Sequence, residues 1–141
     1  MYLGQEAIAE VMVTCLRRGE VLGHYDLAGY AILSNHVHVL LLPKIAPAKL
    51  LQSLKGATAR QCNLILGRTG ESFWQAESYD HWVRDKGEWF RILAYIENNL
   101  VKAGLVQRAS DYRWSSAYKK SVETSLDAAD TSVRATSPRI I

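Results

Sequence analysis

Two histidines one residue apart, His36 and His38, are the residues of this sequence best suited to chemistry. In a β-strand the side chains of residues i and i+2 point to the same face, so the two imidazoles are expected to lie side by side. Such a pair can bind one divalent cation and leave other coordination positions for water, a protein oxygen or a phosphate oxygen. The same pattern also suits an exposed or stacked pair of histidines. A metal site therefore needs a further ligand and a reactive group elsewhere.

A predicted helix over residues 86–103 offers both. Tyr95 and Asn99 are four residues apart on its polar arc and are therefore neighbours. A tyrosine phenol can attack a DNA phosphodiester to form a phosphotyrosine link, and the Asn99 carbonyl oxygen suits a hard cation. The alternative is an amphipathic helix whose polar arc meets only solvent. The two arcs separate at helical spacing, with Trp89, Phe90, Leu93, Ile96, Leu100 and Val101 on the apolar one and Glu88, Arg91, Tyr95, Asn98, Asn99 and Lys102 on the other.

Basic residues gather in one region of the chain. Five of them and no acidic residue lie between Lys44 and Arg68, which favours contact with a phosphate backbone or, equally, a solvated basic face. Aromatic side chains follow at 74–82, where they can stack on unpaired bases or belong to the core. The residues expected to contact DNA are Lys49, Lys55, Arg60, Arg68, Arg84, Arg91 and Lys102.

Composition indicates one globular domain. The chain has 141 residues, of which 48% are hydrophobic, with a net charge of +3 and a pI of about 8.9. This mild basicity permits a nucleic-acid partner without requiring one. Cys15 and Cys62 are isolated, as is typical of reduced buried thiols. No signal peptide or membrane-spanning run is evident, so a cytoplasmic protein is expected.

Local patterns predict the elements that must position these side chains. Helices are expected over 4–19, 47–66 and 86–103, and strands over 25–33 and 36–42, with a short strand near 78–83. Ser34 and Asn35 are predicted to form a two-residue hairpin turn. Residues 119–141 turn polar and small, which predicts a weakly ordered tail.

Four ordered sequence blocks carry a resemblance to a known family. They are Ala-Ile-Leu-Ser-Asn-His-Val-His-Val-Leu-Leu at 31–41, Phe-Trp-Gln-Ala-Glu-Ser-Tyr-Asp-His-Trp-Val-Arg-Asp at 73–85, Ala-Tyr-Ile-Glu-Asn-Asn-Leu-Val-Lys-Ala-Gly-Leu at 94–105 and Trp-Ser-Ser-Ala at 114–117. Together they make residues 2–118 resemble the single-tyrosine transposases of the HUH superfamily. The likeness is strongest to the REP-associated tyrosine transposases and to the IS200-like transposases of small bacterial insertion sequences.

The resemblance implies a fold and an activity. The expected fold is an α+β domain over residues 1–118, with an antiparallel sheet and helices on one side, ferredoxin-like or RRM-like. His36, His38 and Asn99 would bind Mg²⁺ or Mn²⁺, and Tyr95 would be the nucleophile. The family cuts and rejoins single-stranded hairpin or palindromic DNA through a 5′-phosphotyrosine intermediate.

Three departures from the family pattern qualify this expectation. The family usually begins with a strand beside the histidine strand, and this chain starts after it, so an unpaired sheet edge is expected there. Leu100 replaces a common proline after Asn99, and Ser34 replaces another in the turn. An active transposase and a DNA-binding remnant without catalysis therefore both stay open. The monomer, the homodimer and the DNA target sequence are not distinguished by the sequence.

Overall fold

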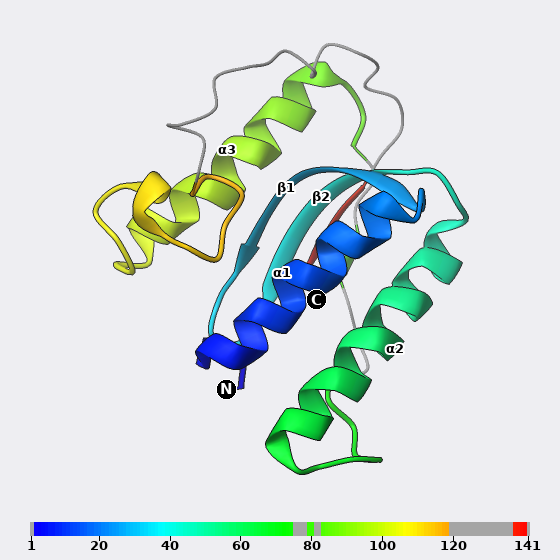
Figure 1. The fold of residues 1–141 in the computed structure, drawn as a ribbon. Helices are drawn as coiled ribbons and strands as arrows, with labels where there is room; N and C mark the ends of the chain where they lie inside the picture. Colours follow the sequence, from blue (N-terminus) through cyan, green and yellow to red (C-terminus); the bar gives the residue numbers. More distant parts are fainter. Residues whose placement is uncertain (1, 75–78, 81–82, 119–136, 141) are drawn as a thin grey trace.

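The computed structural model describes residues 2–74, 79–80, 83–118 and 137–140, which form an α+β fold with an antiparallel sheet, as predicted (Figure 1). None of the helices in these residues is long and apolar enough to cross a lipid bilayer. In chain order the elements are η1 (Tyr2–Gly4), α1 (Glu6–Val21), β1 (Tyr25–Ile32), β2 (Val37–Pro43), α2 (Pro47–Leu66), β3 (Tyr79–Asp80), α3 (Lys86–Lys102), η2 (Ala109–Asp111) and β4 (Ser137–Ile140).

The hairpin of β1 and β2 is the centre of the fold. Ile32 pairs with Val37, and the Leu33 N–H donates to the His36 carbonyl oxygen at 2.8 Å across the turn. Ser34 and Asn35 therefore form the two-residue connection that the sequence predicted. His36 therefore directly follows the turn, and His38 lies two residues further along, in β2.

The other side of β2 is covered by a strand from the C-terminal region. The strand order is β1-β2-β4-β3, and His38 of β2 pairs with Ile140 of β4 in antiparallel register. The expected open edge beside the histidine strand is thus wrong for this structure, because β4 takes up the backbone groups of β2. Residues 137–140, inside the predicted tail, form this strand, and residues 119–136 lie outside the described part of the chain.

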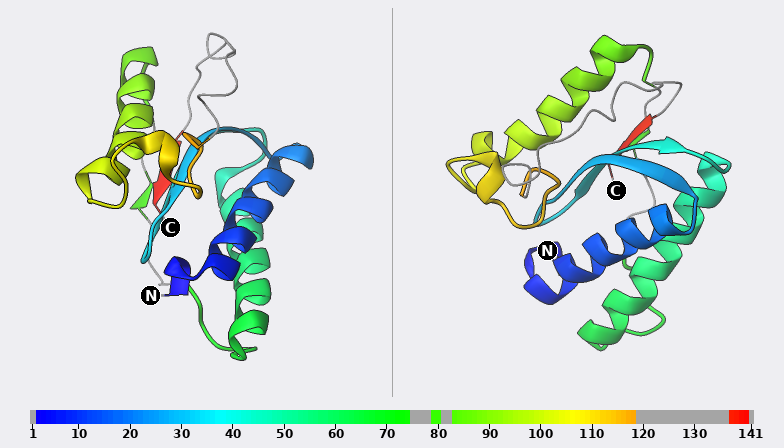
Figure 2. Two further views of the ribbon diagram at one scale, coloured as in Figure 1. Left: turned by 60° about the vertical axis from the view of Figure 1, so that its left-hand side comes forward. Right: turned by 45° about the horizontal axis from the view of Figure 1, so that its top comes forward.

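Helices cover both faces of the sheet, and the left view of Figure 2 shows α3 on one side and α1 with α2 on the other. Val37, Val39 and Leu41 of β2 pack with α1 and α2, in a core where Cys15 and Cys62 are free buried thiols, as predicted. Leu40, on the opposite face of the same strand, packs with α3. The expectation of helices on one side therefore holds only for α1 and α2. A strand that is apolar on both faces requires cover on both.

Strand β1 contains a β-bulge. Leu27 pairs with Leu41 and Gly29 with Leu40, so Ala28 is the extra residue. Beyond the bulge, Gly29 faces α3, where a Cβ atom would collide with the Leu93 side chain. Glycine at this position therefore leaves room for the Leu93 side chain of α3.

The Trp-Ser-Ser-Ala block at 114–117 protects the outer edge of β1. The Ile32 N–H donates to the Trp114 carbonyl at 2.9 Å, and the Ser116 N–H donates to the Tyr30 carbonyl at 3.0 Å. The Ser116 hydroxyl also accepts the Tyr30 N–H at 3.0 Å. This segment occupies hydrogen-bonding groups that an edge strand would otherwise expose.

Candidate active site

The two histidines meet on the α3 face of the sheet, as their spacing predicted. Their Nε2 atoms lie 2.9 Å apart, and the rings meet edge to face with centroids separated by 4.6 Å. The His38 side chain is buried, with 4% exposed, whereas His36 is half-buried at the end of the hairpin. One nitrogen of each ring therefore points at the same small volume.

Asn35 orients the outer ring, a role that sequence reasoning missed. Its Oδ1 atom lies 2.7 Å from Nδ1 of His36. A carbonyl oxygen only accepts, so Nδ1 carries the proton and Nε2 keeps its lone pair. Hydrogen bonds of this kind commonly fix the tautomer of a metal-binding histidine. The only signal in the sequence was a polar residue directly before the pair.

The surroundings keep both imidazoles neutral. Burial lowers the pKa of His36, and burial together with the neighbouring His36 lowers the pKa of His38 to about 4. A neutral imidazole has a free lone pair, which a protonated one lacks. At neutral pH both rings are therefore uncharged, which is the state in which an imidazole binds a metal ion.

The two Nε2 atoms are close enough to contact one metal ion together. Their separation of 2.9 Å is also a hydrogen-bonding distance between the two rings. Within the part of the chain that is described, no third His, Cys, Asp or Glu completes a metal-binding group. Among the described residues, a further ligand would therefore have to be of another kind, such as an amide oxygen, alongside water or a phosphate.

Tyr95 lies next to the histidine pair. Its ring centroid is 5.8 Å from that of His38, at an interplanar angle of 87°, and 55% of the residue is exposed. It belongs to α3, whose N-cap is Asp85, and the Asp85 carboxylate accepts the Glu88 N–H at 2.8 Å. Buried Trp89, Ile96 and Leu100 hold α3 on the sheet. The phenol is therefore held beside the histidines while it stays accessible from solvent.

Asn99 lies one turn beyond Tyr95 on α3 and is half-buried. Among the described residues, neither a hydrogen bond nor a ring contact joins its side chain to the histidines. The structure thus brings together His36, His38 and Tyr95, and the role of Asn99 as a third ligand stays a prediction.

The basic residues expected to contact DNA divide between the two faces of the molecule. Lys49, Lys55 and Arg60 belong to α2, and Arg68 follows it, whereas Arg91 and Lys102 are exposed on α3. Two of the predicted contacts are already in ion pairs, Arg68 with Glu71 at 3.0 Å and Arg84 with Glu88 at 3.6 Å.

Of the aromatic residues at 74–82, the structure describes the side-chain contacts of Trp74. The Trp74 indole N–H donates to the Thr58 hydroxyl at 2.9 Å, and its ring packs against the α1 and α2 core, which supports a structural role. His81 and Trp82 lie outside the described residues.

Comparison with known families agrees with this geometry. A family model described as "Transposase IS200 like" matches residues 5–99, which is more than half of the chain. The chain belongs to this family of transposases, which bind and cut DNA. No curated protein and no solved structure matches it. The matched range contains both histidines, Tyr95 and Asn99.

Proposed function

We propose that this protein cuts and rejoins single-stranded DNA with Tyr95 as the nucleophile and the histidine pair as the metal site. The observation that carries the proposal is the exposed Tyr95 ring in edge contact with buried His38, whose Nε2 atom lies 2.9 Å from that of His36. A nucleophile and a metal-binding pair on adjoining elements form the minimal set for phosphodiester transfer.

The chemical step exchanges one phosphoester bond for another. The Tyr95 oxygen attacks the scissile phosphorus and loses its proton to solvent, and a Tyr–O–P bond forms. The bond from phosphorus to the 3′-oxygen breaks, and that oxygen takes up a proton to leave a free 3′-OH. The 5′-phosphotyrosine keeps the ester bond, so a 3′-OH can later displace Tyr95 and join strands without an external energy source.

His36, His38 and Asn99 would hold Mg²⁺ or Mn²⁺. The ion supplies Lewis-acid polarisation of the scissile phosphate and helps to orient it. Asn35 would present the correct nitrogen of His36, through the hydrogen bond at 2.7 Å.

The α3 surface supports a DNA substrate at this site. Arg91 and Lys102 are exposed on the helix that presents Tyr95 and suit contact with a phosphate backbone. Tyr95 projects from the side of a helix, and a single DNA strand can bring its phosphates to such a position more easily than a duplex can. We infer that the substrate is the single-stranded part of a hairpin or palindromic repeat.

Incubation with labelled hairpin strands and Mn²⁺, followed by a denaturing gel, tests this proposal. The native protein is expected to give a band shifted by covalent protein, and Tyr95→Phe is expected to abolish it. Tyr118→Phe, at another exposed tyrosine, is the matched control and keeps the band. An adduct that survives Tyr95→Phe contradicts the nucleophile, and full activity in His36→Ala with His38→Ala contradicts the metal site.

A second candidate is DNA binding without cutting. The observation that favours it is that the described residues offer two histidines and no third His, Cys, Asp or Glu ligand. It predicts salt-sensitive binding of hairpins with no adduct at any Mn²⁺ concentration.

A further inference from the structure

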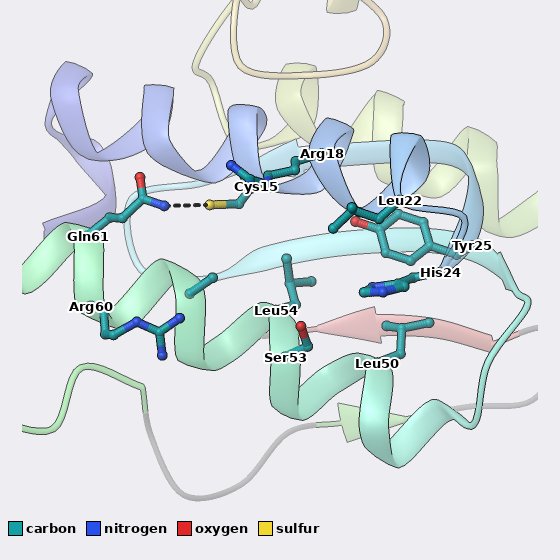
Figure 3. A pocket seen from close by; sticks show the side chains of 12 residues that line it. Cys15, Arg18, Leu22, His24, Tyr25, Leu50, Ser53, Leu54, Arg60 and Gln61 are labelled. Atoms are coloured by element: carbon teal, nitrogen blue, oxygen red, sulfur yellow. Dashed lines mark hydrogen bonds between the residues drawn. The ribbon is translucent and has the colours of Figure 1, made fainter.

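The three long helices are held on the sheet in different ways. On one face, α1 and α2 pack against each other, and Figure 3 shows their side chains meeting over a groove of about 300 Å³, where the Gln61 amide donates to the Cys15 sulfur at 3.7 Å. On the other face, the main described neighbours of α3 are β1, β2 and η2 (Figure 2). Contacts at the two flanks of α3 therefore decide how this helix is rotated about its own axis.

Tyr95 and Glu97 lie on opposite flanks of α3. The buried stripe of the helix, which packs on the sheet, consists of Trp89, Ile96 and Leu100. At about 100° per residue, Tyr95 and Glu97 are about 200° apart around the helix axis, so one lies on each side of this stripe. A rotation of α3 that lifts Glu97 from the sheet therefore also displaces Tyr95.

Glu97 contacts the segment 114–117 at the outer edge of β1. The Ser116 hydroxyl donates to Oε2 of Glu97 at 3.4 Å. Gly29 of β1 lies beneath this contact, because a Cβ atom built there would be 3.5 Å from the Ser116 hydroxyl oxygen and would collide with Leu93. Leu93 is four residues before Glu97 and so shares its flank. The flank of α3 opposite Tyr95 is thus held against the edge of β1.

Strand β1 holds the Ser116 hydroxyl in place. Its oxygen accepts the Tyr30 N–H at 3.0 Å, which leaves the hydroxyl proton for another partner. The printed acceptors for that proton are the Tyr30 carbonyl at 3.3 Å and the Glu97 carboxylate at 3.4 Å. The Tyr30 carbonyl already accepts the Ser116 N–H at 3.0 Å, and a carboxylate is the stronger acceptor. The hydroxyl proton is therefore directed to Glu97.

We propose that Glu97 is a positioning residue, which through Ser116 fixes the rotation of α3 and so holds the Tyr95 ring beside His38. The geometry that it maintains is the edge contact of the two rings, whose centroids are 5.8 Å apart. Glu97 acts from the far flank of the helix and not on the reacting atoms. The consequence for DNA cutting rests on the proposed function, whereas the consequence for the ring contact does not.

NMR spectroscopy of the whole protein, without DNA or metal, tests the position of α3. The native protein is expected to give a nuclear Overhauser cross-peak between the Tyr95 and His38 rings. Glu97→Ala removes the acceptor and should lose most of this cross-peak, while its circular dichroism spectrum stays that of the folded protein. Asn98→Ala, on the exposed side of the same helix, is the matched control and should keep the cross-peak.

Two further variants separate this contact from a general loss of packing. Glu97→Gln keeps an acceptor oxygen on a side chain of the same length, so it should retain most of the cross-peak. Ser116→Ala removes the donor and should lose as much of the cross-peak as Glu97→Ala. The double variant should lose no more than either single variant, because both side chains act through one contact.

The rate of covalent adduct formation shows what this position contributes to cutting. At saturating hairpin DNA, Glu97→Ala should slow the adduct about 10- to 100-fold and leave the half-saturating DNA concentration within about twofold, since a displaced nucleophile impairs the chemical step. The expected cross-peak losses with no adduct even from the native protein contradict the proposed function and support the positioning role. That role is overturned if the native protein lacks the cross-peak, if Glu97→Ala keeps the cross-peak or the full rate, or if Asn98→Ala or Glu97→Gln loses as much as Glu97→Ala.

Discussion

Alternating residues of β2 give its two faces different compositions and different neighbours. On the α1 and α2 face, Val37, Val39 and Leu41 join a purely structural core. On the α3 face, His36 and His38 precede Leu40, so two imidazoles lie at the end of an otherwise apolar surface. One face therefore holds the sheet to two helices, and the other holds a reactive group against a third.

The difference shows why the proposed chemistry would lie under α3. A buried imidazole needs apolar neighbours to stay neutral and an opening through which a substrate can reach it. His38 is buried, with 4% exposed, and the exposed ring of Tyr95 lies beside it. On the α1 and α2 face, β2 contributes Val37, Val39 and Leu41 and no polar side chain.

Truncation of one leucine on each face should give the largest effects on stability. Leu40 and Leu41 are both fully buried, so alanine at either position should lower the free energy of unfolding by about 2–5 kcal/mol. Only Leu40→Ala loosens the packing of α3, which carries Tyr95. It should therefore also reduce covalent adduct per folded molecule, whereas Leu41→Ala should not.

Urea unfolding with the adduct assay measures both quantities. Equal adduct yields from the two folded variants would mean that α3 packing does not position the nucleophile.

Acid should lower the free energy of unfolding through protonation of His38. Its pKa is about 4 in the folded protein and about 6.5 when unfolded, so between these values only the unfolded chain takes up the proton. The free energy of unfolding should therefore fall as the pH drops from 6.5 to 4, by up to about 3 kcal/mol. His38→Gln should remove most of this slope in urea titrations at pH 7, 5.5 and 4. An unchanged slope would show that other groups cause it.

Loss of the Asn35 amide should affect the metal and spare the fold. Asn35→Ala frees the His36 ring to change tautomer and rotate, so the affinity for Mn²⁺ should fall by about 10- to 100-fold. The free energy of unfolding should change by less than about 0.5 kcal/mol because the residue is exposed. Titration with Mn²⁺ followed by electron paramagnetic resonance measures the affinity. Ser34→Ala, in the same turn, is the control, and an equal loss in both variants would argue against a specific role of Asn35.

The smallest effect is expected at the outer edge of the sheet. The Tyr112 hydroxyl donates to the Ile32 carbonyl at 2.7 Å, so Tyr112→Phe should lower the free energy of unfolding by about 1 kcal/mol. Tyr118→Phe, at an exposed hydroxyl, should change it by a few tenths at most. Thermal unfolding compares the two, and equal effects would remove the argument that the edge of β1 is held by this segment.

Local signals predicted several elements well. The helix expected over 47–66 has the same bounds in the structure, because Pro47 occupies its first turn and Gly67 adopts a φ of 70° after its last. The histidine pair and the neighbouring turn also followed from spacing. These features depend on residues that are close in sequence, where propensity and periodicity carry the information.

Features that depend on distant residues were not predicted. The position of α3 on the second face was missed, although Leu40 and Leu42 made the histidine face partly apolar in the sequence. The bulge at Ala28 changes the register by one residue, which no periodicity reveals. β4 contains Pro138, which argues against a strand inside a sheet. The contact between Asn35 and His36 depends on a rotamer, and the groove exists only once α1 packs beside α2.

The position of β4 has a consequence for how the chain assembles. The β1–β2 hairpin closes across a two-residue turn, whereas His38 and Ile140 are about 100 positions apart. Closing a long loop is entropically unfavourable until other contacts form, so the hairpin should assemble early and β4 late. During synthesis, the backbone groups on one edge of β2 therefore stay unpaired until residues 137–140 have been made. During that interval the nascent protein can mispair along the strand that bears the histidines.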